Sequence, residues 1–377
     1  MKSRIRLVID MLKIRNALTA SPLPTIKDFK DNKLINGFKP SPDRGFSADA
    51  CRLWEKYFGF LFEKSEFGIN LQKKLEEFTD AKDEKHPLKK LHRFLKENDD
   101  KVNNENLLKL LLVRPDDPDI GFYLDKIPKK LSKECKKRIE KIFDYGSATK
   151  TESFKEFVYL LGVSVCPYCG RAFTTTAEIN RGKFYRTNQI DHFIPKAQFP
   201  HLALSIWNLI PVCASCNHTK RDRSYKDLPY PYAEGMGDLY RFNLGVTRSL
   251  DYMISFKTGV GWEPKLVEYR IGDDSEDELL RKLKSEAEML HIEELYSSHA
   301  DYVQDICLQR MIFNDAYIDE IYEKFRVHFN SKADVRRLLY MKSIDSEKIG
   351  SSPLDKLARD IDMQIDDLIK KSREDWF

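Results

Sequence analysis

The sequence lacks long apolar runs and any segment that resembles a secretion signal. No stretch of the 377 residues approaches the ~18 consecutive apolar residues of a membrane-spanning helix. Residues 1–18, MKSRIRLVIDMLKIRNAL, carry charges inside their apolar stretch, and no small-residue cleavage site follows them. We therefore expect a cytoplasmic protein.

The sequence also lacks a strong excess of one charge. Its 64 Lys and Arg side chains face 60 Asp and Glu side chains, for a net charge of +4. This balance excludes a protein that binds nucleic acid through its overall charge, so any basic surface must be local. There is no internal repeat of solenoid length and no low-complexity segment. The length suggests two or three globular domains.

Cysteine is scarce, and its positions are informative. Four of the seven cysteines form two Cys-x2-Cys pairs, and three stand alone in segments of helical pattern. The pairs are Cys166 with Cys169 and Cys213 with Cys216; the single ones are Cys51, Cys135 and Cys307. We expect the single ones to be buried apolar residues. A scattered disulfide framework is not expected in a reducing cytosol.

The two cysteine pairs predict a structural zinc site. The x2 spacing lets both sulfurs of a pair reach one ion from a tight turn, and the second pair completes a tetrahedron. A redox dithiol is one alternative, although it would leave the second pair without a purpose. An iron–sulfur cluster is the other, although this spacing is not typical of one.

The apolar periodicity predicts an α+β protein with three regions. Residues 1–150 are expected to form a helical N-terminal region, interrupted at turn-forming stretches such as VRPDDPDIG. Residues 151–228 contain both cysteine pairs and form the central module. Residues 229–377 are expected to form a short β-hairpin, from YMISFKTG and KLVEYRI, and then helices. The last helix, within SSPLDKLARDIDMQIDDLIKK, is either buried in the same chain or docks another subunit.

Asp191 and His192 are adjacent between the two cysteine pairs, at the expected end of a strand. A bend before Pro195 would let both side chains face one site. A carboxylate is a hard ligand suited to Mg²⁺ or Mn²⁺. An imidazole can accept a proton near neutral pH. The pair therefore combines a metal ligand with a general base, although an Asp-His pair alone is common.

Residues 166–220 resemble the zinc-containing HNH endonucleases, a group of ββα-metal nucleases. The matching stretches are CPYC, IDHFIPK, WNLIPVC and CASCNHTK, in the order of the family. The resemblance covers this central segment only. It implies a zinc-stapled ββα-metal module that hydrolyses nucleic acid.

The resemblance implies a role for each matched position. Asp191 matches the acidic metal ligand, and His192 matches the general base that activates water. Asn208 matches the asparagine that orients the loop and the base. Asn217, directly after the last cysteine, matches the other ligand of the catalytic metal, where many relatives have histidine; an amide oxygen can also bind Mg²⁺. Lys220 matches the basic residue that follows in the helix.

Further side chains near the last cysteine are candidates for substrate contact. Lys220, Arg221 and Arg223 can hold flanking phosphates, although a solvated helix end is an equal interpretation of the two arginines. His218 is either a solvent-facing or packing residue, or it contacts the substrate or replaces a ligand. His201 either approaches the site as well or is a loop histidine with no role, and we expect the second.

The function expected is a Mg²⁺- or Mn²⁺-dependent endonuclease with a structural Zn²⁺, acting on double-stranded DNA in preference to RNA. The alternative is a non-catalytic zinc ribbon that binds nucleic acid or protein. That alternative accounts for the cysteines but not for Asp191, His192, Asn208 and Asn217. An HNH module between helical flanks also loosely resembles bacterial effectors that act with a partner ATPase against phage, which implies antiviral defence.

Overall fold

The computed structural model describes six stretches of the chain. They are residues 66–79, 87–96, 102–244, 262–269, 275–344 and 349–374. Cys51 and the helices expected before residue 66 lie outside these stretches.

The chain divides into two compact units. One, here called the site unit, comprises residues 2–163 and 174–225. The other, the C-terminal unit, comprises residues 164–173 and 226–377. The boundaries expected after residues 150 and 228 stay a prediction.

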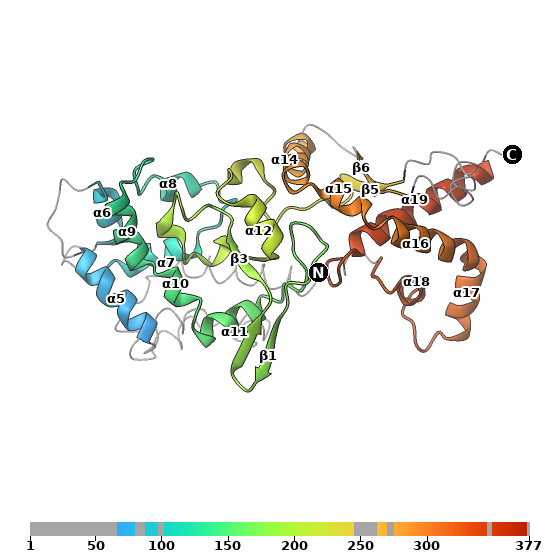
Figure 1. Cartoon of the computed structure of the whole chain (residues 1–377), viewed down its shortest axis with the longest axis horizontal. Helices are drawn as coiled ribbons and strands as arrows, with labels where there is room; N and C mark the ends of the chain where they lie inside the picture. Colours follow the sequence, from blue (N-terminus) through green and yellow to red (C-terminus); the bar gives the residue numbers. More distant parts are fainter. Residues whose placement is uncertain are drawn as a thin grey trace. The chain divides into compact units, whose positions relative to one another are not determined.

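The described part of the site unit begins with helices (Figure 1). They are α5 (Glu66–Thr79), α6 (Lys89–Leu95), α7 (Asn104–Leu112), α8 (Ile120–Leu124), α9 (Lys133–Ile142), α10 (Tyr145–Ala148) and α11 (Glu152–Leu160). Four of them begin after a side chain that accepts a hydrogen bond from a backbone N–H of the first turn: Asn103, Ser132, Asp144 and Thr151. Such caps satisfy N–H groups that have no partner inside the helix.

An apolar stripe holds these helices together. On α9, Cys135, Ile139 and Ile142 recur at helical spacing and are all buried, while lysines cover the rest of the helix. α5 packs against α9 and contributes the fully buried Leu75. Cys135 is therefore a buried apolar residue, as expected.

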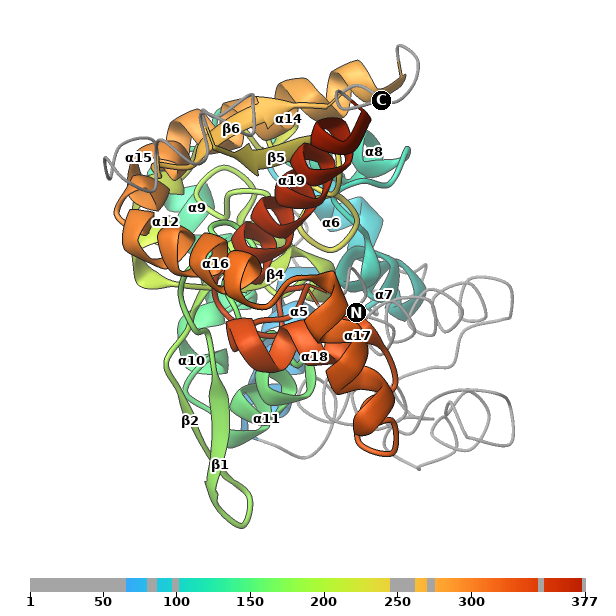
Figure 2. The ribbon, with the colours of Figure 1, turned by 90° about the vertical axis from the view of Figure 1, so that its right-hand side faces the viewer.

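In the part of the site unit that the structure describes, the named strands form two antiparallel pairs. β1 (Thr176–Asn180) pairs with β2 (Lys183–Arg186) in a hairpin beside α11. The tip of this hairpin extends beyond α11 in both views (Figures 1 and 2). β3 (Gln189–His192) pairs with β4 (Leu209–Val212).

The β3–β4 pair and the helix after it make a ββα unit. In the register, Asp191 lies opposite Ile210 and His192 opposite Leu209. The connection from β3 to β4 contains the short 3-10 turns η2 (Pro200–Leu202) and η3 (Ile206–Asn208). α12 (Ala214–Lys220) follows β4 directly and packs against β3. The chain turns once more in η4 (Tyr225–Asp227), where the site unit ends.

The described residues of the C-terminal unit form one small sheet and several helices. The sheet pairs β5 (Tyr240–Asn243) with β6 (Lys265–Glu268). The helices are α14 (Ser275–Leu290), α15 (Ile292–Ser297), α16 (Ala300–Ile312), α17 (Asp315–Lys324), α18 (Lys332–Tyr340) and α19 (Asp355–Glu374). The expected strand KLVEYRI contains β6. The other expected strand, residues 252–259, lies outside the described residues, and β5 was not expected.

α19 is buried in its own unit, which decides between the two interpretations of this helix. Leu357, Ile361 and Ile365 are buried on one face, and α19 packs against α16 and β5 (Figure 2). Asp360 Oδ2 accepts a hydrogen bond from the N–H of Phe242 on β5 at 2.9 Å.

Arginines from two neighbouring helices neutralise the acidic side of α19. Arg336 Nη1 lies 2.9 Å from Asp362 Oδ2, and Arg310 forms an ion pair with Asp366. Tyr340 Oη donates to Asp362 Oδ1 at 2.7 Å. These pairs allow the carboxylates to lie at a packed interface, because a buried charge needs a partner.

The described chain is a mixed α+β structure that is mostly helical with small sheets, as expected. Cys307 is buried in α16, also as expected. Among the described residues, no helix combines the length and the apolar character needed to cross a membrane.

Candidate active site and metal centre

The four paired cysteines come together. Their Sγ atoms all lie within 4.8 Å of one another. Cys166, Cys169 and Cys216 are buried and Cys213 is half-buried. In a tetrahedral zinc site with Zn–S bonds of ~2.3 Å, the sulfurs are about 3.8 Å apart. The cluster therefore has the donor type and the spacing of a structural zinc site.

The first cysteine turn is shaped by its own backbone and by α15 of the same unit. The N–H of Gly170 donates to the carbonyl of Cys166 at 2.9 Å. Gly170 has a φ of +62°, a conformation that other residues rarely adopt. Tyr296 Oη donates to the carbonyl of Cys169 at 2.8 Å, and a Cβ at Gly170 would lie 3.0 Å from that hydroxyl. Glycine is therefore required at this position in CPYCG.

The second cysteine turn starts α12. Cys213 is the N-cap residue, and its Sγ accepts a hydrogen bond from the N–H of Cys216 at 3.5 Å. Asn217 then falls one position after Cys216 and is half-buried. Its Nδ2 donates to Gln189 Oε1 on β3 at 2.6 Å. Gln189 and Asp191 are two residues apart on β3 and share a face of the strand, so Asn217 lies along the face that carries Asp191.

Asp191 is paired with a buried lysine. Lys220 Nζ lies 2.9 Å from Asp191 Oδ2 and 3.2 Å from Oδ1, and the Lys220 side chain is 0% exposed. The same ammonium donates to the carbonyls of His192 at 3.2 Å and Phe193 at 3.3 Å. Carboxylate and carbonyl oxygens thus surround one cation. The ammonium of Lys220 faces this site and not the solvent. A phosphate in solution therefore does not reach it in this conformation.

His192 is buried and oriented by a backbone carbonyl. Its Nε2 lies 3.0 Å from the carbonyl oxygen of Ala203. Because a carbonyl only accepts, Nε2 carries the proton, and Nδ1 keeps the lone pair. Burial lowers the pKa of His192 to about 3; the charges of Lys196 and Lys220 add to this, and the bond to Ala203 opposes it. The imidazole is therefore neutral near pH 7.

Asn208 connects the two sides of the loop around His192. Its Oδ1 accepts from the N–H of Ile194 at 2.6 Å. Its Nδ2 donates to the carbonyls of Ile194 at 3.1 Å and Leu202 at 3.2 Å. Leu202 directly precedes Ala203, whose carbonyl orients His192. The Asn208 amide therefore fixes the backbone that fixes the imidazole.

Two side chains beside His192 were not predicted. The Tyr145 ring, from α10, packs edge-on against the imidazole, with centroids 4.5 Å apart. Lys196 Nζ lies 4.4 Å from the centroid of the Tyr145 ring, and burial lowers the pKa of Lys196. Lys196 belongs to the stretch IDHFIPK, so the motif itself could have indicated it. Tyr145 lies in a segment with no motif, and no sequence signal points to it.

The other candidate residues lie apart from the buried pair. His218, Arg221 and Arg223 are all exposed. Arg221, at the end of α12, donates from Nε to the carbonyl of His218 at 3.1 Å. His201 is buried, with Nε2 3.0 Å from the carbonyl of Tyr123, and burial lowers its pKa to about 4. His201 thus binds the backbone of α8 and none of the candidate site residues.

Comparison with known proteins identifies the segment that contains these features. The family model described as HNH endonuclease matches residues 166–223. No curated protein matches the chain, and neither does any solved structure. The matched segment includes both cysteine pairs, the β3–β4–α12 unit, Asp191 and His192. Residues 166–223 thus form an HNH endonuclease domain, which makes this protein a phosphodiester hydrolase.

Proposed function

We propose that the domain is a metal-dependent endonuclease that cleaves double-stranded DNA in preference to RNA. One observation carries the proposal: a neutral imidazole, His192, is held by a backbone carbonyl one residue after a buried carboxylate, Asp191, and the Lys220 ammonium that pairs with Asp191 also binds the His192 carbonyl. Hydrolysis of a phosphodiester needs a base for the attacking water and a group that stabilises negative charge on the phosphate. The two adjacent residues are suited to these two tasks.

His192 acts as the general base in this proposal. The Ala203 carbonyl holds the Nε2 proton, so Nδ1 is the atom that accepts a proton from water. A base must be unprotonated before the reaction, and burial keeps the His192 ring neutral at neutral pH, while the lowered pKa also makes the ring a weaker proton acceptor. Asn208 positions this base through Leu202 and does not touch the substrate itself.

The residues around Asp191 suit a divalent cation. They already surround the Lys220 ammonium with the oxygen donors that Mg²⁺ and Mn²⁺ prefer. Asn217 uses Nδ2 to bind Gln189, so Oδ1 is the amide atom that remains for a metal. Asp191 and Asn217 would hold the ion. When bound, it supplies positive charge for the transition state and the leaving oxygen.

The structural zinc and the exposed cations complete the proposal. Because Cys213 is both a zinc ligand and the N-cap of α12, a zinc ion fixes the start of the helix that presents Asn217. Arg221, Arg223 and His218 are exposed near the end of α12 and contact the flanking phosphates. A phosphate contact by Lys220 would require its buried ion pair with Asp191 to open.

A plasmid-cleavage assay with a matched control tests the proposal. His192→Ala is compared with His201→Ala, because both histidines are buried with Nε2 3.0 Å from a carbonyl. With Mg²⁺ or Mn²⁺, the wild type and His201→Ala are expected to cut supercoiled DNA. His192→Ala should lose about 10²- to 10⁴-fold in rate, the usual contribution of a general base. Equal cleavage by His192→Ala would disprove the assigned base.

The alternative and the wider role are tested separately. A non-catalytic zinc ribbon would bind DNA or RNA without cutting either, with the wild type included. A partner ATPase and a role in defence against phage rest only on the loose resemblance of the helical flanks. Co-purification with proteins from neighbouring genes tests the partner ATPase and the defence role. A nuclease that is fully active alone and protects no host from phage would contradict both.

A further inference from the structure

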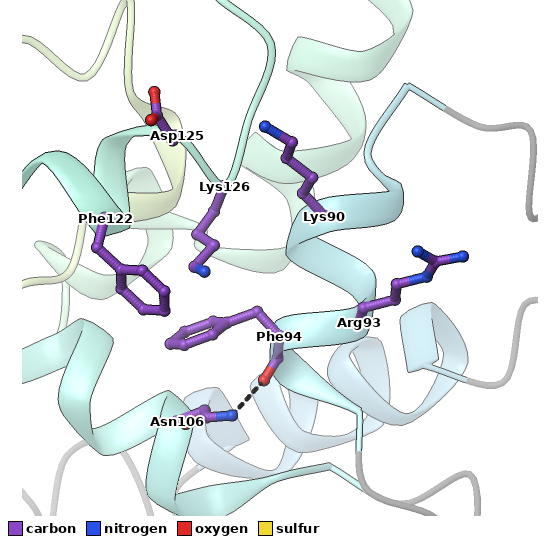
Figure 3. Close-up of a pocket in the computed structure, with 7 residues that line it drawn as sticks. All are labelled: Lys90, Arg93, Phe94, Asn106, Phe122, Asp125 and Lys126. Carbon is purple, nitrogen blue, oxygen red and sulfur yellow. Dashed lines mark hydrogen bonds between the residues drawn. The ribbon is translucent and has the colours of Figure 1, made fainter.

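A hollow of about 540 Å³ opens among the helices that precede the endonuclease domain. Its walls come from α6, α7, α8 and the two residues after α8, all within the site unit (Figure 3). The volume lies within the ~300–1,000 Å³ of typical ligand pockets. No residue of the matched segment 166–223 lines it, so the hollow is separate from the catalytic site.

Two phenylalanine rings form the apolar part of the hollow. Phe94 and Phe122 meet edge to face, with centroids 5.8 Å apart, and the Tyr123 ring packs against Phe122 at 5.3 Å. Asn106 Nδ2 donates to the carbonyl of Phe94 at 2.8 Å, which ties α7 to α6 (Figure 3). Phe122 is nevertheless 55% exposed, unusual for so large an apolar side chain. A braced ring that is more than half exposed is a platform on which a flat aromatic ligand can stack, on the face that the Lys126 ammonium does not cover.

Three cations and one carboxylate line the hollow. Lys126 Nζ lies 3.2 Å from the centroid of the Phe122 ring and 4.7 Å from that of Phe94. Lys90 and Arg93 extend from α6, with Arg93 pointing away from the rings (Figure 3). In the part of the chain that the structure describes, none of the three forms an ion pair.

The surroundings of Lys126 favour an anion. Burial, and then the charge of Lys90, lowers the pKa of Lys126, and Asp125 opposes this only in part. A partly desolvated ammonium beside a second cation is stabilised when negative charge approaches. An anionic ligand would therefore find a partner that is already in place.

We propose that this hollow binds a nucleotide, with its base stacked on Phe122 and its phosphates held by Lys126 and Lys90 and, after a change of rotamer, by Arg93. Stacking accepts any base, and ammonium and guanidinium groups bind phosphate oxygens. Inorganic phosphate would leave Phe122 unused, and the carboxylates of an acidic peptide need no aromatic surface. The ligand is either a free nucleotide or one nucleotide of a nucleic-acid strand, and its binding does not depend on catalysis at His192.

Direct binding to the full chain tests this site. A fluorescent adenosine triphosphate analogue is titrated by anisotropy and then displaced with adenosine triphosphate, inorganic triphosphate or a short single-stranded oligonucleotide. Phe122→Ala should weaken binding about 5- to 150-fold, which corresponds to ~1–3 kcal/mol per stacked base. Lys126→Ala should also weaken it, whereas His192→Ala should bind like the wild type and so separates this site from the nuclease proposal.

Matched controls define what is specific. Two alanine variants serve as controls and should bind the nucleotide like the wild type. One is Phe325→Ala, at a phenylalanine of the C-terminal unit that is 45% exposed, and the other is Lys129→Ala, at an exposed lysine outside the hollow. If Phe122→Ala does not fold, Phe122→Leu keeps an apolar side chain without an aromatic face and should still weaken binding.

The competitors distinguish the source of the nucleotide. Displacement by adenosine triphosphate but not by the oligonucleotide indicates a free nucleotide, and stronger displacement by the oligonucleotide indicates a strand; either result supports the site. Three results overturn the site. The first is no binding at millimolar nucleotide, and the second is wild-type affinity in both Phe122→Ala and Lys126→Ala. The third is equal affinity for inorganic triphosphate and adenosine triphosphate, with no effect of Phe122→Ala on either.

Discussion

The ammonium of Lys220 lies 2.9 Å from the carboxylate of Asp191, and both side chains are buried. Breaking a buried ion pair by removing one partner typically costs ~3–5 kcal/mol, because the other charge is left uncompensated. Lys220→Met should therefore lower the free energy of unfolding by about that amount in urea titrations. The double variant Asp191→Asn/Lys220→Met should recover much of the loss, because it leaves no buried charge.

Two comparisons make this first prediction specific. Lys155→Ala removes an exposed pair with Glu152 at 2.6 Å and should cost no more than ~1 kcal/mol. Mg²⁺ should raise the melting temperature of Lys220→Met but not that of the double variant, because a cation can replace the ammonium only where Asp191 remains. A Lys220→Met protein as stable as the wild type without metal would contradict the pair.

His201 should make stability depend on pH. Its folded pKa is about 4, below its ordinary value of 6.5, because burial disfavours the charged ring. The unfolded chain therefore binds the proton more readily than the folded protein. The stability that the neutral His201 contributes is fully present above pH 6.5 and is lost as the pH falls towards 4. The expected slope is at most ~1.4 kcal/mol per pH unit.

A neutral replacement isolates this effect. His201→Gln keeps a donor for the Tyr123 carbonyl but does not titrate. Urea unfolding between pH 4 and 7 should show a shallower loss of stability for His201→Gln than for the wild type. Parallel curves would mean that His201 does not titrate differently in the folded and unfolded states.

Asn208 should act through the loop and not on the substrate. Asn208→Ala removes three hydrogen bonds to Ile194 and Leu202. The Leu202 carbonyl still accepts from the N–H of Ser205 at 3.1 Å, so the cost of ~1–3 kcal/mol for each buried group falls on the N–H and the carbonyl of Ile194. Asn208→Asp can still accept from the N–H of Ile194 but cannot donate to either carbonyl. We expect faster amide exchange at Ile194 and a lower kcat in Asn208→Ala, with little change in KM. A change in KM alone would indicate direct substrate contact.

The cysteine cluster predicts a metal content that mutation can remove. Wild-type protein should retain about one zinc ion per chain after desalting, and Cys213→Ser should lose most of it. Cys307→Ser is the control, because Cys307 is a buried cysteine outside the cluster. His192→Ala should also keep its zinc. Unchanged zinc in Cys213→Ser would refute the assigned ligand.

The features that local spacing determines were predictable from the sequence. The cysteine pairs, the strand that ends at His192 and the helix from Ala214 depend on residues within a few positions of one another. Apart from the meeting of the two cysteine pairs, which their shared motif predicted, pairings across long separations were not. Asp191 meets Lys220 29 residues later, and Tyr296 supports Cys169 across 127 residues. Such contacts follow from how whole elements pack, and no local pattern encodes them.

The last prediction decides whether Asn217 or His218 is a ligand of the proposed catalytic metal. The two are adjacent on α12, so their side chains point in directions about 100° apart. Asn217 is half-buried and bonded to Gln189 on β3, two residues from Asp191, whereas His218 is exposed. Asn217→Ala should therefore lower the cleavage rate at fixed Mg²⁺ at least ~10- to 100-fold, since even an outer partner of a metal ligand costs that much. His218→Ala should lower it much less, because it removes only an exposed phosphate contact.

A third variant separates a ligand from a merely structural residue. Asn217→His introduces the side chain that many HNH relatives carry at this position, and imidazole favours softer ions than an amide oxygen does. We expect it to retain cleavage with Mn²⁺ better than with Mg²⁺, measured as the ratio of the two rates. A structural role would give the same ratio as the wild type. Loss of cleavage in His218→Ala together with retention in Asn217→Ala would reverse the assignment, because the metal would then be held from the exposed side of α12.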